Sequence, residues 1–110
     1  FLAGDTTLPM MYMPDAINAT INLMESDRSK ISVRSSYNVA GVSFSPSDLA
    51  GEIAKHINGF KCTYSPDERQ ELAESWPRSI DDSVARNEWG WQPSFDLGQM
   101  TVDMLKNLKY

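Results

Sequence analysis

Residues 64–91 read Y-S-P-D-E-R-Q-E-L-A-E-S-W-P-R-S-I-D-D-S-V-A-R-N-E-W-G-W. This stretch holds all three tryptophans of the chain and two signals for the start of a helix. At the first signal, Ser65 is a capping residue type, Pro66 suits the first helical position, and Glu68 follows at the spacing of a capping box. We therefore expect a short helical turn after Ser65.

The second helix of this stretch is expected at Asp82–Trp89. Adjacent aspartates favour its start, and Gly90 is the residue type that ends helices in a left-handed conformation. Between the two helices, Pro77 disfavours the α-helical region for the preceding Trp76. Trp76 is therefore held on a non-helical elbow, where a large aromatic ring either fills a core or forms the wall of a ligand pocket. The residues alone leave both interpretations open.

The rest of the chain alternates between strand and helix patterns. Ile17, Ile21 and Met24 recur at the helical spacing and form one apolar face. Ser45 and Pro46 repeat the capping signal before a second helix. The fold class that follows is α/β, with a small mixed sheet and about four helices. The predicted helices are Pro14–Glu25, Pro46–Ile57, Asp82–Trp89 and Leu97–Lys109; the predicted strands are Thr7–Met13, Tyr37–Ala40 and Phe60–Tyr64, with a further short edge strand at Ile31–Val33.

Three residues could carry chemistry but also have structural explanations. Asp15 could be a catalytic or ligand carboxylate, although the helix dipole also explains an acid at a helix start. Cys62 would face inward or sideways on the last predicted strand, and we expect it to be buried because nothing nearby would lower its pKa. His56, at a helix end, has no partner set for a catalytic triad and no second ligand for zinc. The carboxylate pairs, Asp67-Glu68 and Asp81-Asp82, fall at predicted helix starts. The residues themselves therefore predict no catalytic, cofactor-binding or metal-ligating residue.

Composition limits the classes of partner. The 110 residues are enough for one domain, residues 1–110, with a modest core. A net charge of −5 without a basic stripe argues against a nucleic-acid partner. No apolar run approaches the roughly 20 residues that a membrane span needs. The single cysteine excludes an internal disulfide and fits a reduced, cytoplasmic setting.

Five segments of the sequence, taken in order, resemble a known family. They are P-M-M-Y-M-P-D-A at 9–16, Y-N-V-A at 37–40, S-F-S-P-S-D-L-A at 43–50, D-E-R-Q-E-L-A-E-S-W-P at 67–77 and S-I-D-D-S-V-A-R-N-E-W-G-W at 79–91. The set resembles the C-terminal third of the extended short-chain dehydrogenase/reductase family. Within that family it is most similar to the NAD-dependent L-threonine 3-dehydrogenase branch.

The resemblance implies the substrate-side lobe of a Rossmann-type enzyme. The longer enzyme would bind NAD and oxidise the 3-hydroxyl of L-threonine to 2-amino-3-oxobutanoate. Trp76 matches the tryptophan of the family's S-W-P elbow, which implies a substrate-binding role. The nucleotide fingerprint and the Tyr-x-x-x-Lys pair of the family would precede Phe1, which is itself not an initiator methionine. We therefore expect a fragment that binds no cofactor alone and supplies no catalytic residue.

Two other functions stay open. Many sugar-nucleotide members of the family carry an arginine, which pairs with diphosphate, where this chain has Thr7-Leu8-Pro9. Its absence disfavours, without excluding, the C-terminal part of a nucleotide-sugar epimerase or dehydratase. The chain could also be a stand-alone interaction module without catalysis. Because a separated lobe would expose apolar surface, we expect the isolated chain to self-associate.

Overall fold

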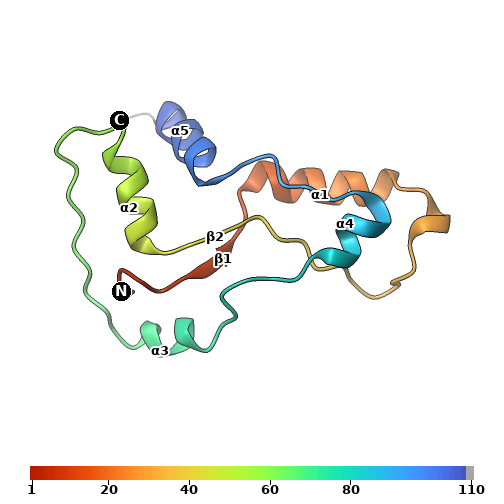
Figure 1. Ribbon diagram of the computed structural model, residues 1–110, viewed down its shortest axis with the longest axis horizontal. Helices are drawn as coiled ribbons and strands as arrows, with labels where there is room; N and C mark the ends of the chain where they lie inside the picture. Colours follow the sequence, from red (N-terminus) through yellow and green to blue (C-terminus); the bar gives the residue numbers. More distant parts are fainter. Residues whose placement is uncertain (109–110) are drawn as a thin grey trace.

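The computed structural model describes residues 1–108, which form a mixed α/β structure (Figure 1). Two short strands lie at the centre, and the helices surround them on the two long sides of the molecule. In chain order the elements are β1 (Leu8–Met10), α1 (Met13–Glu25), the 3-10 turn η1 (Arg28–Lys30), β2 (Val42–Phe44), α2 (Pro46–Ala54), α3 (Arg69–Glu74), α4 (Ser83–Trp89) and α5 (Leu97–Asn107). The expected α/β class is confirmed.

The sheet of the described residues is a single antiparallel pair. β1 runs against β2, with Pro9 opposite Ser43 at the middle of the register. Gly41 allows this close approach, since a Cβ atom there would lie 2.7 Å from the carbonyl oxygen of Met10. The expected mixed sheet is therefore wrong in detail: residues 1–108 contain no parallel strand.

Three predicted strands are absent from the described residues because their backbone groups find other partners or none. Residues 37–40 are extended, but the Ala40 amide donates to Asp82 Oδ2 at 3.2 Å and its carbonyl accepts from Trp91 Nε1 at 3.0 Å. Side chains thus occupy the positions that a neighbouring strand would take. Residues 60–64 have no strand beside them, and 61–64 are exposed. Residues 31–33 follow η1 as irregular backbone rather than as an edge strand.

The helices follow the capping pattern of the sequence. Ser45 accepts from the Asp48 amide, and Asp48 accepts from the Ser45 amide, which completes a capping box at the start of α2. Asp96 and Gln99 form the same box at α5. Gly90 ends α4 with φ 73°, in the left-handed region that favours glycine.

Several helix boundaries differ from the prediction. α1 begins at Met13 instead of Pro14, and α4 begins at Ser83 instead of Asp82. α2 ends at Ala54 instead of Ile57. After Ala54 the backbone changes to i→i+3 hydrogen bonds, in which the amides of Lys55 and His56 donate to the carbonyls three residues earlier. α3 begins at Arg69, after Glu68, so the capping pattern at Ser65 does not start it. The predicted end of the last helix, Lys109, lies outside the described residues.

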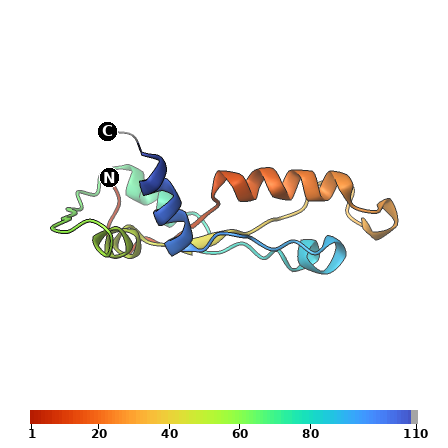
Figure 2. The ribbon, with the colours of Figure 1, turned by 90° about the horizontal axis from the view of Figure 1, so that it is seen from above.

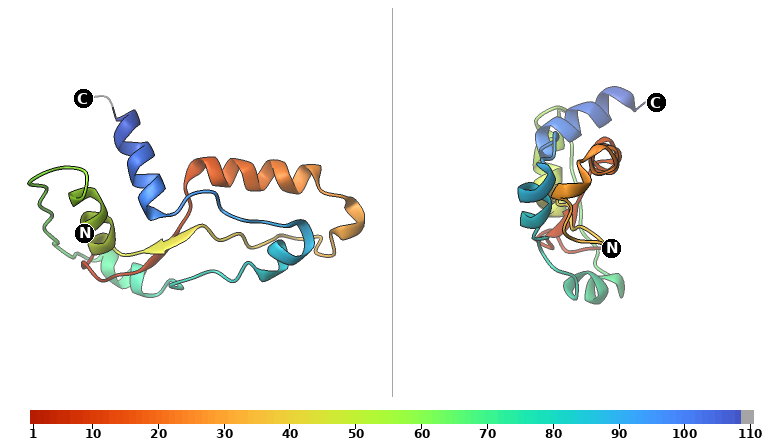
Figure 3. Two further views of the ribbon diagram at one scale, coloured as in Figure 1. Left: turned by 45° about the horizontal axis from the view of Figure 1, so that its top comes forward. Right: turned by 90° about the vertical axis from the view of Figure 1, so that its right-hand side faces the viewer.

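The molecule is long and flat, measuring 52 × 33 × 20 Å (Figures 2 and 3). Its radius of gyration is 16.6 Å, against about 13 Å for a compact chain of this length. The small core lies between α1 and α4, where Ala19, Ala85 and Trp91 are buried. α2 packs against α5 at the other end. Within residues 1–108 no helix has the length and apolar content to cross a membrane.

Candidate functional site

Trp76 lies on the predicted elbow, outside α3, and its side chain is 62% exposed. The exposed fraction excludes the core-filling interpretation in this structure. The indole instead borders a cavity of about 260 Å³ between α3 and the segment that leads into β1. The cavity is lined by Ala3, Asp5, Thr6, Thr7, Gln70, Ala73, Glu74, Trp76 and Arg78.

The cavity beside Trp76 combines both signs of charge with one apolar wall. Asp5 and Glu74 supply carboxylates, and Arg78 supplies a guanidinium. A small zwitterion carries an ammonium group, which a carboxylate binds, and a carboxylate group, which a guanidinium binds. The arrangement can therefore orient an amino acid, with the indole covering its side chain.

Asp15 has a structural role. It is 1% exposed, and its two oxygens accept hydrogen bonds from the Ser94 amide at 2.8 Å and the Phe95 amide at 3.1 Å. Both oxygens thus accept from backbone donors, and burial keeps the carboxylate away from a ligand in solvent. Asp15 lies in the first turn of α1, as the helix-dipole interpretation predicts, and it also ties α1 to the segment before α5.

Tyr12 makes a long-range hydrogen bond that sequence reasoning missed. Its hydroxyl donates to Asp103 Oδ2 at 2.7 Å, and its ring meets Phe95 edge-on at 4.9 Å. The hydrogen bond to the Asp103 carboxylate raises the pKa of Tyr12. No sequence signal links these residues, which are 91 positions apart.

The paired carboxylates hold helix starts, as predicted. Arg69 binds Asp67 through two side-chain nitrogens and lowers the pKa of Asp67 to about 2. Asp82 is buried beside Arg86, whose guanidinium donates to it at 2.7 Å and lowers the pKa of Asp82. Asp81 accepts from the Ser83 amide at 2.9 Å. Neither pair faces the cavity beside Trp76.

Cys62 is exposed, so its predicted burial is wrong. The burial was expected from an inward-facing strand position, and residues 60–64 form no strand. His56 lies just after α2, where its Nε2 is 3.5 Å from Glu52 Oε1, so a contact with the last turns of the helix accounts for its position. Among residues 1–108 no group of three His, Cys, Asp or Glu side chains is placed to hold a metal ion.

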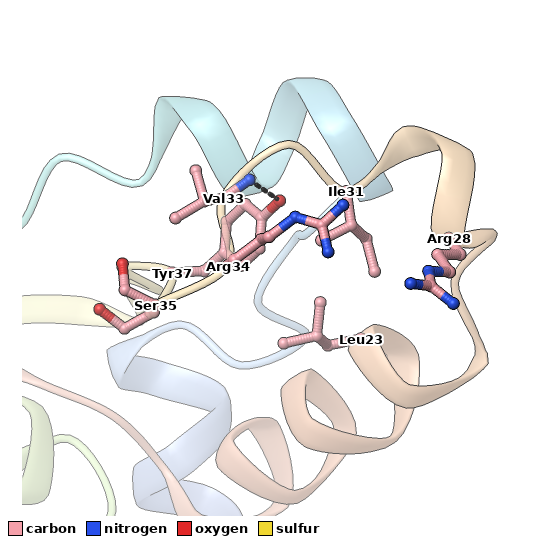
Figure 4. A pocket seen from close by; sticks show the side chains of 8 residues that line it. Leu23, Arg28, Ile31, Val33, Arg34, Ser35 and Tyr37 are labelled. Carbon is pink, nitrogen blue, oxygen red and sulfur yellow. Dashed lines mark hydrogen bonds between the residues drawn. The ribbon is translucent and has the colours of Figure 1, made fainter.

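A second cavity, of about 410 Å³, lies at the η1 end of the molecule (Figure 4). Arg28 and Arg34 line it together with two apolar side chains, and in this view Ile31 lies between the two arginines and Leu23 lies below. Both arginines are exposed, and no hydrogen bond to another described residue holds either guanidinium in place. The cavity beside Trp76 is the better candidate, because hydrogen bonds join the two backbone segments that form its walls, α3 and the segment that leads into β1.

Comparison with known proteins identifies relatives over nearly the whole chain, although no family model matches it. An uncharacterised epimerase/dehydratase of Staphylococcus haemolyticus is 47% identical over 110 residues, which are 99% of this chain and 35% of that protein. The mitochondrial L-threonine 3-dehydrogenase of Sus scrofa is 48% identical over 101 residues, or 91% of this chain and 27% of that protein.

The structural comparison agrees. The GalE-like L-threonine dehydrogenase from Cupriavidus necator in its apo form matches with a TM-score of 0.95 and 56% identity, covering 99% of this chain and 39% of that one. The chain therefore spans 27–39% of the length of these relatives. Because the identity extends over almost every residue described above, the chain belongs to the extended short-chain dehydrogenase/reductase family, in the group formed by L-threonine 3-dehydrogenases and epimerase/dehydratases.

Proposed function

We propose that the chain forms the substrate-side lobe of an NAD-dependent oxidoreductase that oxidises the 3-hydroxyl of L-threonine to 2-amino-3-oxobutanoate. The observation that carries the proposal is the cavity beside Trp76. Its wall is an exposed indole, and its lining holds charges of both signs, in a chain 56% identical to a threonine dehydrogenase. Trp76 would cover the substrate and exclude water, while the charged groups orient the ammonium and carboxylate.

NAD would accept the hydride removed from the substrate carbon in the longer enzyme. The residues of this chain do not by themselves fit a dinucleotide, because the sequence has no G-x-G-x-x-G loop to receive a pyrophosphate. It also has no Tyr-x-x-x-Lys pair to move the proton of the hydroxyl. We therefore assign binding and orientation of the substrate to this chain and no step of the hydride transfer. The cytoplasmic setting inferred from the single cysteine is likewise a proposal.

A nucleotide-sugar epimerase or dehydratase is the second candidate, since some relatives carry that name. Against it, Thr7 and Pro9 occupy the segment where a diphosphate would need a cation. Thr7 lies in the lining of the cavity, and the only guanidinium in that lining is Arg78.

The test is a chimera in which this chain replaces the matching segment of the Cupriavidus necator enzyme. The replaced segment is 56% identical and superposes with a TM-score of 0.95, so the junctions need little adjustment. We expect the chimera to reduce NAD in the presence of L-threonine. A folded chimera that binds NAD but does not oxidise threonine would contradict the proposal. Turnover of a nucleotide sugar in its place would favour the second candidate.

The chain alone is expected not to bind NAD measurably. It lacks the backbone amides that cradle a pyrophosphate and the positive end of the helix that follows such a loop. Isothermal titration calorimetry of NAD into the chain checks this, with the chimera as the positive control. Micromolar binding to the chain alone would overturn the assignment of the cofactor to the rest of the enzyme.

A further inference from the structure

α3 is attached to the molecule by a few contacts with the N-terminal segment. The helix has no buried residue, and within residues 61–81 only Gln70 and Ala73 are half-buried while the others are exposed. Long irregular segments flank α3 on both sides (Figure 1). Apolar burial therefore contributes little to holding α3, and polar contacts must fix its position.

Gln70 makes those polar contacts. Its Oε1 accepts from the Ala3 amide at 2.8 Å and from the Thr6 hydroxyl at 3.3 Å. Its Nε2 donates to Thr6 Oγ1 at 2.8 Å and to Glu74 Oε1 at 2.8 Å. Because only the carbonyl end of the amide can accept from the Ala3 amide, its orientation is determined. Gln70 thus joins α3 to the segment that leads into β1. Two contacts with Phe1 lie beside it: the Asp67 amide donates to the Phe1 carbonyl at 3.3 Å, and the Arg69 guanidinium lies 4.0 Å from the centre of the Phe1 ring.

The same contacts determine where the indole of Trp76 lies. Trp76 follows α3 directly, and its amide donates to the Ala73 carbonyl at 3.2 Å, which couples the elbow to the last turn of the helix. The opposite side of the cavity is formed by the residues that Gln70 binds. Gln70 therefore sets the distance between the two walls of the cavity.

We propose that Gln70 is the positioning residue of the Trp76 wall: through Ala3 and Thr6 it holds α3, and with it the indole, at the spacing that fits a small amino acid. The inference rests on the proposed function for its kinetic consequence only. The attachment of α3 can be measured on the chain itself.

The first experiment measures hydrogen exchange of the α3 amides in the isolated chain. Gln70→Glu keeps the shape and the acceptor for Ala3 but removes the donor to Thr6, and Thr6→Val removes the hydroxyl. Each loses hydrogen bonds worth roughly 1 kcal/mol apiece, so exchange in α3 should rise on the order of tenfold. Glu71→Gln, an exposed change on the same helix with no contact to Thr6, is the matched control and should change nothing.

Fluorescence reports the indole itself. Trp76 is the most exposed tryptophan, so acrylamide quenching and anisotropy decay of the chain, compared with Trp76→Phe, isolate its signal. We expect faster local motion of the indole in Gln70→Glu and Thr6→Val. Unchanged exchange in α3 together with unchanged motion of Trp76 would overturn the proposal, whatever the activity of any chimera.

The kinetic experiment uses a double-mutant cycle in the Cupriavidus necator chimera. Gln70→Glu should raise KM for threonine while KM for NAD and the melting temperature stay unchanged. In the Trp76→Ala background the same substitution should add nothing, because it acts through the indole. Additive effects, or a normal KM for threonine despite a mobile α3, would contradict the positioning role. An inactive chimera would instead contradict the proposed function, and the exchange and fluorescence results would decide the role of Gln70.

Discussion

Trp91 and Trp76 place the same indole in opposite surroundings. Trp91 is 1% exposed, packs between Ala19 and Ala85, and donates to the Ala40 carbonyl. Trp76 is bordered by a cavity and solvent. The residue type therefore does not decide its role; the proline after Trp76 does, since it takes that residue out of the helix.

Trp76→Ala should change stability little and substrate binding strongly. The side chain is exposed, so its removal leaves no cavity in the core, and the melting temperature of the chain should shift by only a degree or so. Trp91→Ala, the matched control, should cost about 3–5 kcal/mol. In the chimera, Trp76→Ala should raise KM for threonine. A large loss of stability with normal kinetics would return Trp76 to a structural role.

Asp82 should make stability depend on pH at the acid end. Its pKa lies below the ordinary value of 3.8, chiefly because of the hydrogen bond from Arg86. A lowered pKa in the folded state means that the stabilisation is present above 3.8 and is lost as the pH falls through the folded pKa. Asp82→Asn should therefore lower the melting temperature at neutral pH and converge with the wild type in strong acid. A constant difference at all pH values would contradict this.

At the scale of elements, Asp15 joins two helices that the sequence does not bring together. It accepts two backbone hydrogen bonds from the segment before α5. Asp15→Ala should remove both hydrogen bonds to the charged carboxylate and destabilise the chain by about 3 kcal/mol. Asp15→Asn keeps one acceptor oxygen and should lose less. Thermal unfolding followed by circular dichroism gives both losses of stability. Equal losses for the two variants would contradict a role for both carboxylate oxygens of Asp15.

The helices were predictable from the sequence because their signals are local. Ser45, Asp96 and Gly90 act on backbone groups within one turn of themselves, so the local sequence is enough to predict where these helices begin or end. Of the strands, the one predicted at Thr7–Met13 contains β1, Leu8–Met10. The others were not predictable, because strand pairing depends on distant groups: Asp82 and Trp91 take the hydrogen bonds of Ala40.

The residues of the candidate site also differ in whether a local signal in the sequence predicts them. Trp76 was found through the neighbouring Pro77, which is a local signal. Gln70 and Thr6, which are 64 residues apart, could not be linked by any spacing rule. A capping pattern was equally insufficient at Ser65, because α3 starts only at Arg69.

At the scale of the whole molecule, the chain exposes apolar surface that a compact domain would bury. Ile17, Ile21 and Met24 form the predicted apolar face of α1, yet all three are exposed. A second copy of the chain could cover this face. We therefore expect the isolated chain to dimerise or to form larger oligomers, which light scattering across a concentration series measures.

Ile17→Glu should shift the isolated chain toward the monomer, because it places a charge on the apolar face without removing a buried side chain. Asn18→Glu adds the same charge to the neighbouring exposed position and should leave the oligomer unchanged. A clean monomer of the wild-type chain at high concentration, with no binding of a hydrophobic dye, would contradict the expectation.

The exposed Cys62 makes the chain a single-site target for thiol chemistry. Two copies can join through one intermolecular disulfide in air, which would mimic the association through α1. A reducing agent, or Cys62→Ser, therefore belongs in every sizing experiment. The same thiol accepts a maleimide dye on the irregular segment between α2 and α3. Energy transfer to that dye from Trp76, isolated by comparison with Trp76→Phe, would follow the movement of α3.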